Sequence, residues 1–473
     1  MKLFKNKKVV VMGLGLHGGG AGVAKFFSKQ GADVLVTDLK TKEQLKESLS
    51  KLRGLKIEYA LGGHRQKDFM EADLIIKNPA VPNNSYFLKV AQENKIPVKT
   101  DVGIFFDLCK APIIGITGTK GKSTVATLVY KLIKSKYKDS ILAGNIGVSP
   151  LEFLDGIKKK TKVVLELSSF ELEGLVKSPD IAVITTIYAD HLNRYKDMED
   201  YIEAKKMIFK HQRKKDCLVL NYDSEKARSF AKESSARVYF YSVKSKPDSA
   251  TEKSFGCFLS GENIFFDGEK KETADIKAFK LLGDHNASNL LGALTVAKIL
   301  EVPEEKIKKI ISSFKGVPNR QEFVAEKNGV KYFNDTTATM PEAVVEAIKA
   351  FKKKFFKSKM ALIAGGQDKG LDYKDMAKEI KNNVDFLLLL PGTASEKLLS
   401  YFSPEDKKKI LFAESMEEAV KKARSVAAKG DVVLLSPGAA SFNLFKNEFD
   451  RGNRFIEAVK EINENDQQEV APS

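Results

Sequence analysis

A glycine-rich stretch, GITGTKGKST at residues 115–124, constrains the fold more than any other feature of the chain. The stretch is expected to form a tight turn between a strand and a helix that begins near Lys122. The strand is predicted by the apolar APII before the turn, and the helix by STVATLVYKLI after it. We expect Gly115, Gly118 and Gly121 to let the backbone turn tightly and point N–H groups inward. The positive N-terminal end of the helix adds to them, so the stretch is typical of a phosphate-binding loop.

Individual roles in this loop follow from the P-loop pattern. Lys122 can reach the β- and γ-phosphates, and Ser123 or Thr124 can ligate Mg²⁺. The strict pattern G-x-x-x-x-G-K-[ST] is not met, because its first glycine would fall on Ile116, so the loop is a variant. An ordinary glycine turn beside an unrelated lysine is the alternative, and the G-K-S-T ending makes it the less favoured one.

Chain length and composition bound the class of protein. A chain of 473 residues with 43% hydrophobic content suits about three domains with full cores. No apolar run approaches the roughly 18 residues needed to span a membrane, so no membrane insertion is expected. The N-terminal lysines and apolar residues imitate a signal peptide, but GLGLHGGG interrupts them and makes better sense as a turn. Cys109, Cys217 and Cys257 are odd in number and far apart, which favours the reducing cytoplasm over disulfides or a zinc site.

The formal net charge of +17 raises the question of a nucleic-acid partner. Lysines are spread along the whole chain, as in KKFFKSKM and EDKKKI, and no recognised nucleic-acid motif accompanies them. We therefore favour a lysine-rich solvated surface and expect no nucleic-acid partner. Anionic substrates would benefit from such a field.

The N-terminal block, KNKKVVVMGLGLHGGGAGVAKFFSKQGADVLVTDLK, reads as strand, glycine turn, helix and strand. It contains G-x-G-x-x-G at Gly13, Gly15 and Gly18, with Asp38 at the end of the second strand. This is a dinucleotide-binding fingerprint, but a weak one alone, because any βαβ unit can need such a turn. Further strands are expected at ADLIIKNPAVP and IPVKT.

The rest of the chain also alternates strands with helices, which predicts mostly parallel sheets. Strands are expected at TKVVLELSS, DIAVITTI and DCLVLN, and later at VKYFND, KMALIAGG, VDFLLLLP and DVVLLSPGAA. Residues 243–277 suggest added hairpins, GDHNASNLLGALTVAKIL a capped amphipathic helix, and NENDQQEVAPS a frayed tail. We predict an α/β protein with three domains, at residues 1–106, 107–316 and 317–473.

Polar side chains follow the strands of the middle block, where open α/β sheets place their sites. Glu166 ends an apolar run and would be costly if buried alone, but sensible as a Mg²⁺ ligand. His191 lies just past the next strand. A lone histidine is more often structural than a ligand. We nevertheless favour a ligand role, because His191 is expected at the same sheet edge as Ser123 and Glu166. Lys205 follows on an expected helix, where the residues alone give no reason to prefer it over Lys206.

These motifs together resemble those of the Mur ligases. GITGTKGKST, GNIG, ELSSFELE, DHLNRY, AKKMIF, GDHNASN, GVPNRQEF, AGGQDKGLDY and SPGAASFNLFKNEFDRGNRF occur in the family's order, from about residue 9 to 456. The closing segment is most similar to the D-glutamate-adding branch. The resemblance implies a Rossmann-like first domain that binds a UDP-sugar rather than NAD and a central P-loop ATPase-like domain. It further implies a Rossmann-like third domain that brings the amino acid and swings to close an interdomain cleft.

The implied reaction joins D-glutamate to UDP-N-acetylmuramoyl-L-alanine, which would place the enzyme in peptidoglycan precursor synthesis and cell-wall biogenesis. ATP would phosphorylate the L-alanine carboxylate, because a carboxylate lacks a good leaving group, and the amine of D-glutamate would displace phosphate. Mg²⁺, or Mn²⁺, and lysines would neutralise the charge that builds up as two anions approach. Closure would exclude water. The resemblance implies a cytoplasmic enzyme, and we expect a monomer.

Site residues carry over from the family motifs. The implied metal ligands are Ser123, Glu166, His191 and a Lys205 carbamylated by CO₂. The implied ATP-binding residues are Gly118, Thr119, Lys120, Gly121, Lys122, Ser123, Thr124, Asn286, Asn289, Arg320 and Asp335. The implied contacts to the UDP-sugar are Leu16, His17, Asp38, Leu39, Lys40, Asn78 and Asn145, and those to glutamate are Lys369, Thr339, Ser441 and Phe449. The catalytic set is Lys122, Lys205, His191, Glu166 and Lys369.

The chain departs from the family pattern at three places. Thr337 replaces a lysine, Asn319 replaces a histidine, and Glu448 stands where an aromatic residue often helps to bind glutamate, with Phe449 next to it. These changes leave an alternative open: another Mur or folylpolyglutamate-type ligase that adds a different amino acid, such as L-glutamate. An NAD-dependent dehydrogenase, suggested by GLGLHG and Asp38, leaves the phosphate loop unexplained; a nucleic-acid-binding ATPase rests on charge alone.

Overall fold

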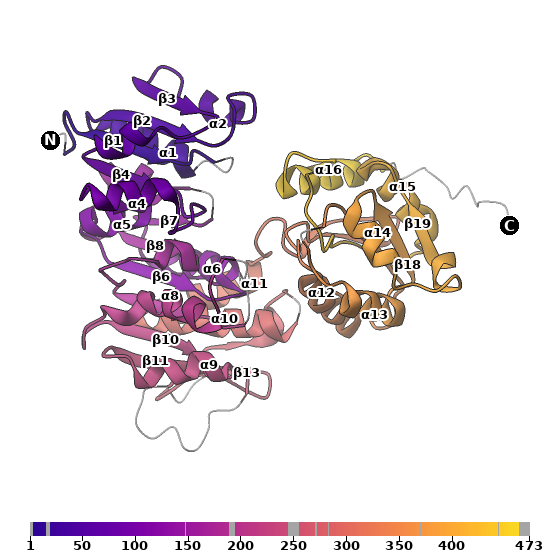
Figure 1. Ribbon diagram of the computed structural model, residues 1–473. Coiled ribbons are helices and arrows are strands. Elements are labelled where there is room, and N and C mark those ends of the chain that lie inside the picture. Colours follow the sequence, from indigo (N-terminus) through magenta and orange to yellow (C-terminus); the bar gives the residue numbers. More distant parts are fainter. Residues whose placement is uncertain are drawn as a thin grey trace. The chain divides into compact units, whose positions relative to one another are not determined.

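The computed structural model describes residues 3–15, 19–146, 148–188, 194–244, 255–269, 272–281, 283–368, 370–442 and 444–462. It divides into two compact units, each described here by itself (Figure 1). Unit 1 comprises Met1–Ala278 and Ser288–Ser312, and unit 2 comprises Phe279–Ala287 and Ser313–Ser473. Among the predicted features, Leu16, His17, Gly18, His191, Lys369 and the tail 463–473 lie outside the described residues.

The first sheet of unit 1 is parallel, with strand order β3-β2-β1-β4-β5. Its strands are β1 (Lys8–Met12), β2 (Asp33–Asp38), β3 (Ile57–Leu61), β4 (Leu74–Lys77) and β5 (Val98–Lys99). The helices of this part are α1 (Gly19–Lys29), α2 (Lys46–Ser50), α3 (Gln66–Met70), α4 (Tyr86–Glu93) and α5 (Asp101–Leu108). The four strands predicted here are confirmed; β3, a half-exposed edge strand, was not predicted.

The alternating side chains of β1 explain why this sheet is covered on both faces. Val9 and Val11 belong to the core that contains α1 and α5, whereas Val10 and Met12 belong to a second core with Phe69 and the residues of α4. Successive strand residues point to opposite faces, so an apolar run without alternation must be buried twice.

The second sheet of unit 1 has the order β14-β13-β12-β11-β10-β9-β6-β8-β7. Its strands are β6 (Ile113–Thr117), β7 (Ser140–Gly144), β8 (Lys162–Glu166), β9 (Ile181–Ile184), β10 (Cys217–Asn221), β11 (Arg237–Ser242), β12 (Phe255–Ser260), β13 (Asn263–Phe266) and β14 (Ala274–Asp275). Its helices are α6 (Lys122–Lys136), η1 (Pro150–Gly156), α7 (Ser169–Leu172), α8 (Met198–Lys210), α9 (Glu225–Ser229), η2 (Phe230–Lys232), η3 (Ile276–Ala278), α10 (Asp284–Ile299) and α11 (Glu304–Ser313). The strands β6 to β12 pair in parallel, while β12, β13 and β14 form the predicted antiparallel hairpins.

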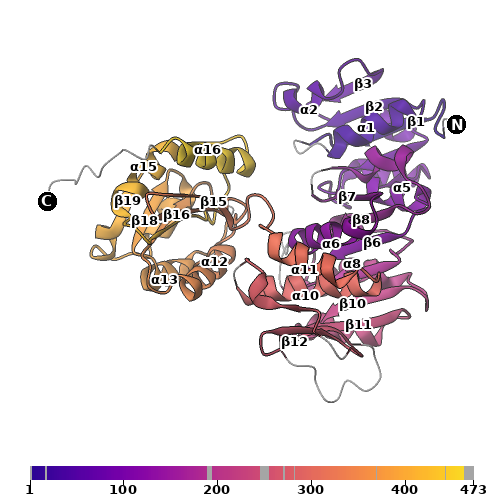
Figure 2. The ribbon, with the colours of Figure 1, turned by 180° about the vertical axis from the view of Figure 1, so that it is seen from behind.

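Helix α10 corrects one expectation. It was expected to be amphipathic, but residues 289–297 are buried on every side of the helix. The reason is its place across the sheet (Figure 2), where Gly292 packs against the Tyr241 ring and Thr295 Oγ1 accepts from the backbone N–H of Cys257. A helix covered all round has no polar stripe to present.

Unit 2 holds a six-stranded sheet of order β15-β16-β20-β17-β18-β19, parallel except for the edge strand β15. The strands are β15 (Glu322–Lys327), β16 (Val330–Asn334), β17 (Met360–Gly365), β18 (Phe386–Leu390), β19 (Ile410–Phe412) and β20 (Val432–Leu435). The helices are α12 (Pro341–Lys354), α13 (Lys374–Asn383), α14 (Thr393–Leu399), η4 (Asp406–Lys409), α15 (Met416–Val426) and α16 (Glu448–Lys460). One core contains α12, α13 and α14, and the other, on the opposite face, contains α15 and α16.

The predicted α/β class with mostly parallel sheets is therefore confirmed. The four strands predicted for unit 2 are present, and β15 and β19 add to them. The boundaries proposed at residues 106 and 316 stay predictions. No helix in the described parts of the chain is long and apolar enough to cross a membrane.

Candidate functional site

The phosphate loop lies between β6 and α6, and two of its glycines have backbone conformations that only glycine adopts easily. Gly118 has φ +146° and Gly121, the N-cap of α6, has φ +87°. A Cβ at Gly118 would lie 1.9 Å from Thr185 Oγ1, and one at Gly121 would lie 2.2 Å from Asn289 Oδ1. No side chain could be accommodated at either place without a shift of its neighbours.

Gly115 does not belong to the turn, contrary to the prediction. It lies inside β6, where a Cβ would come within 2.9 Å of Pro179 Cγ and 3.1 Å of Leu167 Cδ1. Its small size allows close packing against the neighbouring segments. The turn itself begins after Thr117.

Threonines that follow β9 hold the loop from the side. Thr185 Oγ1 donates to the carbonyl of Lys120 at 2.5 Å, and the carbonyl of Thr186 accepts from the N–H of Thr119 at 2.6 Å. Thr119 Oγ1 also shares a hydrogen bond of 3.0 Å with the hydroxyl of Tyr201 on α8. Sequence analysis missed these partners, although two hydroxyl residues directly after an apolar strand were a usable signal.

Two lysines converge on the loop. Lys122 Nζ donates to the carbonyls of Gly118 at 3.0 Å and Thr119 at 3.1 Å. Lys205 Nζ, on α8, donates to the same Gly118 carbonyl at 3.0 Å, and only 1% of Lys205 is exposed. Lys206 instead pairs with carboxylates at the surface, 2.7 Å from Glu203 and 3.0 Å from Glu233. The tertiary structure thus separates two lysines that the residues alone left equivalent, and Lys205 is the one that the family motif implied.

Glu166 ends β8 beside the loop strand, in register with Ile116. It is buried, and its Oε1 accepts from Asn145 Nδ2 at 3.2 Å. Within the described part of the chain, Oε2 has no hydrogen-bond partner. A buried carboxylate oxygen with a free lone pair is costly unless a cation completes it, so the residue fits a divalent metal ligand.

The remaining predicted ligands are incomplete in the described structure. Ser123 is the second residue of α6 and half-buried, and Thr124 is buried. No cluster of three or more His, Cys, Asp or Glu side chains that could hold a metal occurs among the described residues, and His191 lies outside them. Asn286 and Asn289 are both buried near the start of α10, with Asn289 against Gly121.

In the first sheet, Asp38 organises the glycine turn after β1. One carboxylate oxygen accepts from the backbone N–H groups of Leu14 at 2.8 Å and Gly15 at 3.1 Å. The other accepts from the backbone N–H of Lys40 at 2.9 Å. Ser48, which sequence analysis missed, donates to the Gly15 carbonyl at 2.7 Å. One Asp38 oxygen therefore serves the glycine turn, and the other serves the backbone directly after β2.

Two other predicted sugar contacts lie at the same sheet edge. Asn78 follows β4, and its side chain packs so closely on Gly13 that a Cβ there would lie 2.8 Å from Asn78 Cβ. Leu39 is largely exposed.

In unit 2, Asp335 is buried just after β16. It accepts from Ser436 Oγ at 3.0 Å and from the N–H of Gln321 at 3.1 Å, and burial raises its pKa to about 7. Thr337 Oγ1 donates to the carbonyl of Asn319 at 2.9 Å. The two departures from the family pattern therefore contact each other. Asn319 also has φ +67°, a conformation that asparagine tolerates well.

A buried arginine connects the loops that carry the predicted glutamate contacts. The Arg451 guanidinium donates to Thr336 Oγ1 at 3.0 Å, to the Thr336 carbonyl at 2.9 Å and to the Ala439 carbonyl at 3.1 Å. Thr339 and Ser441 follow on these two loops. Sequence analysis gave Arg451 no role of its own.

The other predicted residues of unit 2 lie nearer the surface. Arg320 is exposed and Phe449 is 45% exposed. Glu448 is the first residue of α16, and its carbonyl accepts from Thr336 Oγ1 at 2.8 Å. A carboxylate in the first turn of a helix suits the helix dipole, which is a structural reason for glutamate at this position.

Comparison with known proteins agrees with this geometry. Three family models match the chain: the Mur ligase MurD-like N-terminal domain over residues 7–100, the Mur ligase middle domain over 116–297, and the Mur ligase glutamate ligase domain over 319–438. A curated UDP-N-acetylmuramoylalanine--D-glutamate ligase from Roseiflexus sp. (strain RS-1) is 42% identical, covering 96% of this chain and 98% of the relative. One of the same name from Acetivibrio thermocellus is 38% identical, covering 98% of each chain.

Solved structures share the fold. The UDP-N-acetylmuramate-alanine ligase MurC from Thermotoga maritima superposes with a TM-score of 0.63 at 20% identity, covering 96% of this chain and 99% of the other. At that identity the likeness shows the fold alone. The full-length sequence relatives show more, and this chain belongs to the Mur ligase family.

Proposed function

We propose that this chain is an ATP-dependent ligase that joins D-glutamate to UDP-N-acetylmuramoyl-L-alanine in peptidoglycan synthesis. The observation that carries the proposal is the loop before α6, where the ammonium group of Lys122 donates to the Gly118 and Thr119 carbonyls at the start of the helix. Positive charge gathered at a helix N-terminus suits the phosphates of ATP. The choice of substrates rests on the names of the full-length relatives.

The proposed reaction has two steps. The L-alanine carboxylate attacks the γ-phosphorus of ATP, ADP leaves, and an acyl phosphate forms. The amine of D-glutamate then attacks the acyl carbon, phosphate leaves, and the amide forms with loss of one proton. In the first step Lys122 would neutralise charge on the β- and γ-phosphates, while the loop N–H groups hold them in place.

Glu166 is the best-supported metal ligand of the proposal, because its Oε2 is buried and unpartnered in the described structure. Ser123 would hold one Mg²⁺ with Glu166, and His191 would help to hold a second. Lys205 would be a further ligand after carbamylation, in which the neutral amine adds to CO₂ and releases a proton. A bound Mg²⁺ would supply Lewis-acid stabilisation of phosphate charge. A carbamylated Nζ keeps one N–H, so its hydrogen bond to Gly118 can persist.

The groups proposed for the other ligands divide between the two units. Asp38, Lys40 and Asn78 would serve the UDP-sugar from unit 1. Asp335 would meet the ATP ribose and Arg320 its phosphates, and Thr339 and Ser441 would hold glutamate from unit 2. We further propose that the enzyme acts as a cytoplasmic monomer.

Phosphate release from ATP tests the proposal directly. Purified protein with Mg²⁺ and UDP-N-acetylmuramoyl-L-alanine is offered D-glutamate, L-glutamate and other amino acids in turn. We expect release that requires both the nucleotide sugar and D-glutamate. Release with L-glutamate but not with D-glutamate would mean that the enzyme adds L-glutamate. No release with any acceptor would refute the proposed reaction.

A further inference from the structure

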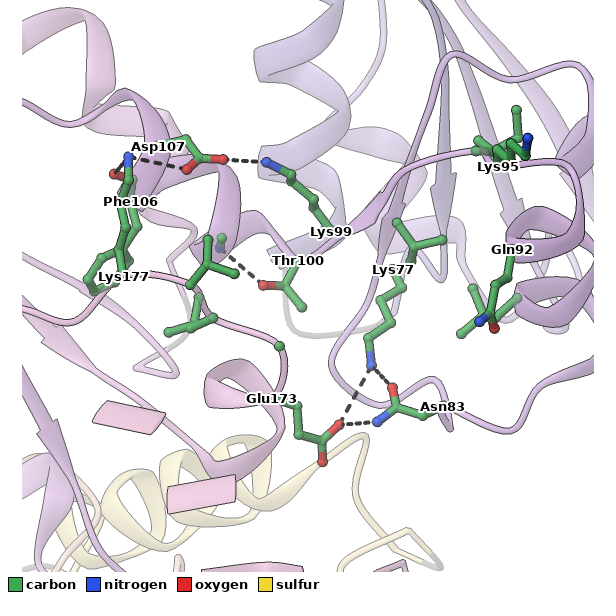
Figure 3. Close-up of a pocket in the computed structure, with 17 residues that line it drawn as sticks. Lys77, Asn83, Gln92, Lys95, Lys99, Thr100, Phe106, Asp107, Glu173 and Lys177 are labelled. Atoms are coloured by element: carbon green, nitrogen blue, oxygen red, sulfur yellow. Dashed lines mark hydrogen bonds and ion pairs between the residues drawn. The ribbon is translucent and has the colours of Figure 1, made fainter. Parts of the chain in front are cut away.

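Unit 1 contains a cavity of about 630 Å³ (Figure 3). Its walls come from β4, α4, β5 and α5 on one side and from residues 173–177, just after α7, on the other. None of the residues proposed above for ATP, the UDP-sugar, glutamate or metal lines it. The volume lies in the range of small-molecule sites, roughly 300 to 1,000 Å³.

The charged lining of this cavity is unbalanced in favour of cations. Asp107 forms ion pairs with two ammonium groups, those of Lys99 and, at 3.3 Å, Lys177. Lys95, on the far side of the cavity in Figure 3, has no carboxylate partner among the described residues. The charged lining residues are four lysines and two carboxylates: Lys77, Lys95, Lys99, Lys177, Asp107 and Glu173.

Lys77 is the most buried of these cations, at 7% exposure, and burial lowers its pKa. Its Nζ lies 3.7 Å from Glu173 and donates to Asn83 Oδ1. Glu173 is shared, however: it also lies 3.7 Å from Arg194 and accepts from the Tyr195 hydroxyl at 2.7 Å. One carboxylate therefore serves two cations at this end as well, and an anion that reached Lys77 would meet an ammonium already stripped of much of its water.

Much of the remaining lining is apolar, beside the polar residues Asn83, Gln92 and Thr100. The hydrophobic residues are Leu88, Ile96, Val98, Phe106, Leu175 and Val176. A site that combines ammonium groups with an apolar wall favours a ligand that has an anionic group and an apolar body. Burial of the body against the wall and ion pairing of the anionic group both contribute to the free energy of binding.

We propose that this cavity binds a small organic anion, a phosphate or carboxylate on an apolar body. The excess positive charge of the four lining lysines favours its charged group, and its body packs on the apolar wall. The cavity shares no lining residue with the sites proposed for the substrates, so the inference does not depend on the ligase reaction.

Calorimetric titration of the full chain with phenyl phosphate tests this site. Saturating ADP and UMP are present throughout, so that the nucleotide sites are filled. We expect one saturable site that binds phenyl phosphate about tenfold or more tightly than inorganic phosphate or phenol, because each of those carries only one half of the ligand. Benzoate in a parallel titration shows whether the site prefers a carboxylate or a phosphate.

A double variant identifies the cavity as the site. Lys95→Gln with Lys177→Gln removes two exposed charges, and we expect phenyl phosphate to bind about tenfold more weakly. The matched control, Lys51→Gln with Lys138→Gln, makes the same charge change at exposed places elsewhere in unit 1 and should bind as the parent does. Equal weakening in both double variants, or the absence of saturable binding in the presence of ADP and UMP, would overturn the proposal. Thermal unfolding of each variant checks that it folds.

Discussion

Lys122 and Lys205 come from different helices and donate to the same acceptor, each Nζ lying 3.0 Å from the carbonyl oxygen of Gly118. Like charges repel, so nearby negative charge, or a change in the charge of one of them, would stabilise two ammonium groups at one oxygen. Bound phosphate would do the first, and carbamylation of Lys205 the second. This relationship leads to the first two predictions.

Replacing Lys205 by alanine should lower ligase activity at least about 100-fold, because the carbamate would lose its place beside the metal. Small carboxylates such as formate should restore part of the activity by occupying the vacated space. Steady-state phosphate release with and without formate measures both effects. Lys206→Ala is the control, since Lys206 pairs with Glu203 and Glu233 at the surface. Full activity in Lys205→Ala would show that no carbamate is needed there.

Replacing Lys122 by alanine should abolish formation of the acyl phosphate, with a loss of about 1,000-fold or more in the single-turnover rate of ADP formation. The reason is the loss of positive charge from the loop at the start of α6. Lys134→Ala, near the other end of the same helix and exposed, should leave the rate unchanged. ADP formation at the parent rate by Lys122→Ala would refute the phosphate role.

Gly118→Ala should prevent normal ATP binding, because the new Cβ would lie 1.9 Å from Thr185 Oγ1 and φ is +146°. The loop would have to move away from the threonine that holds it. Gly174→Ala is a matched control: it also has a positive φ, +73°, but nothing lies within 4 Å of the added Cβ. Nucleotide titration and thermal unfolding of both variants separate the collision from backbone strain alone. Equal loss of ATP affinity in the two would show that the contact with Thr185 is unimportant.

Glu171→Gln should flatten the fall in stability between about pH 4.5 and pH 8. Burial, reinforced by the charge of Asp101, raises the pKa of Glu171 from 4.5 to about 8. An acid with a raised folded pKa contributes stability that is complete below its unfolded pKa and is lost as the pH rises through the folded value, here from about 4.5 to about 8. The amide cannot ionise, yet its oxygen can still accept from Ser168 in the capping box.

Thermal midpoints recorded between about pH 4.5 and pH 8 check this prediction. The parent should lose stability over this range, and Glu171→Gln should lose less. Glu93→Gln, at an exposed position, should follow the parent curve. Parallel curves for all three proteins would mean that Glu171 is ionised at no cost in the folded chain.

Much of the fold was predictable because its strands are buried on both faces. Runs such as KVVVM and FLLLL have no polar alternation, and such runs are typical of covered parallel sheets. The strands that were missed include β3, β15 and β19, which lie at sheet edges and carry exposed or mixed residues. Their pairing partners, rather than their own pattern, make them strands.

The sequence by itself determined the phosphate loop, the alternation of strands and helices, and the polar residues at strand ends, because these depend on local geometry and on residues close in the chain. Only the tertiary structure decided that Lys205 rather than Lys206 faces the loop, that Gly115 serves packing, and that α10 is buried all round. Each of these depends on which distant segment covers a given face. Helical and strand periodicity place a side chain on a face, but the neighbour that meets that face comes from elsewhere in the chain.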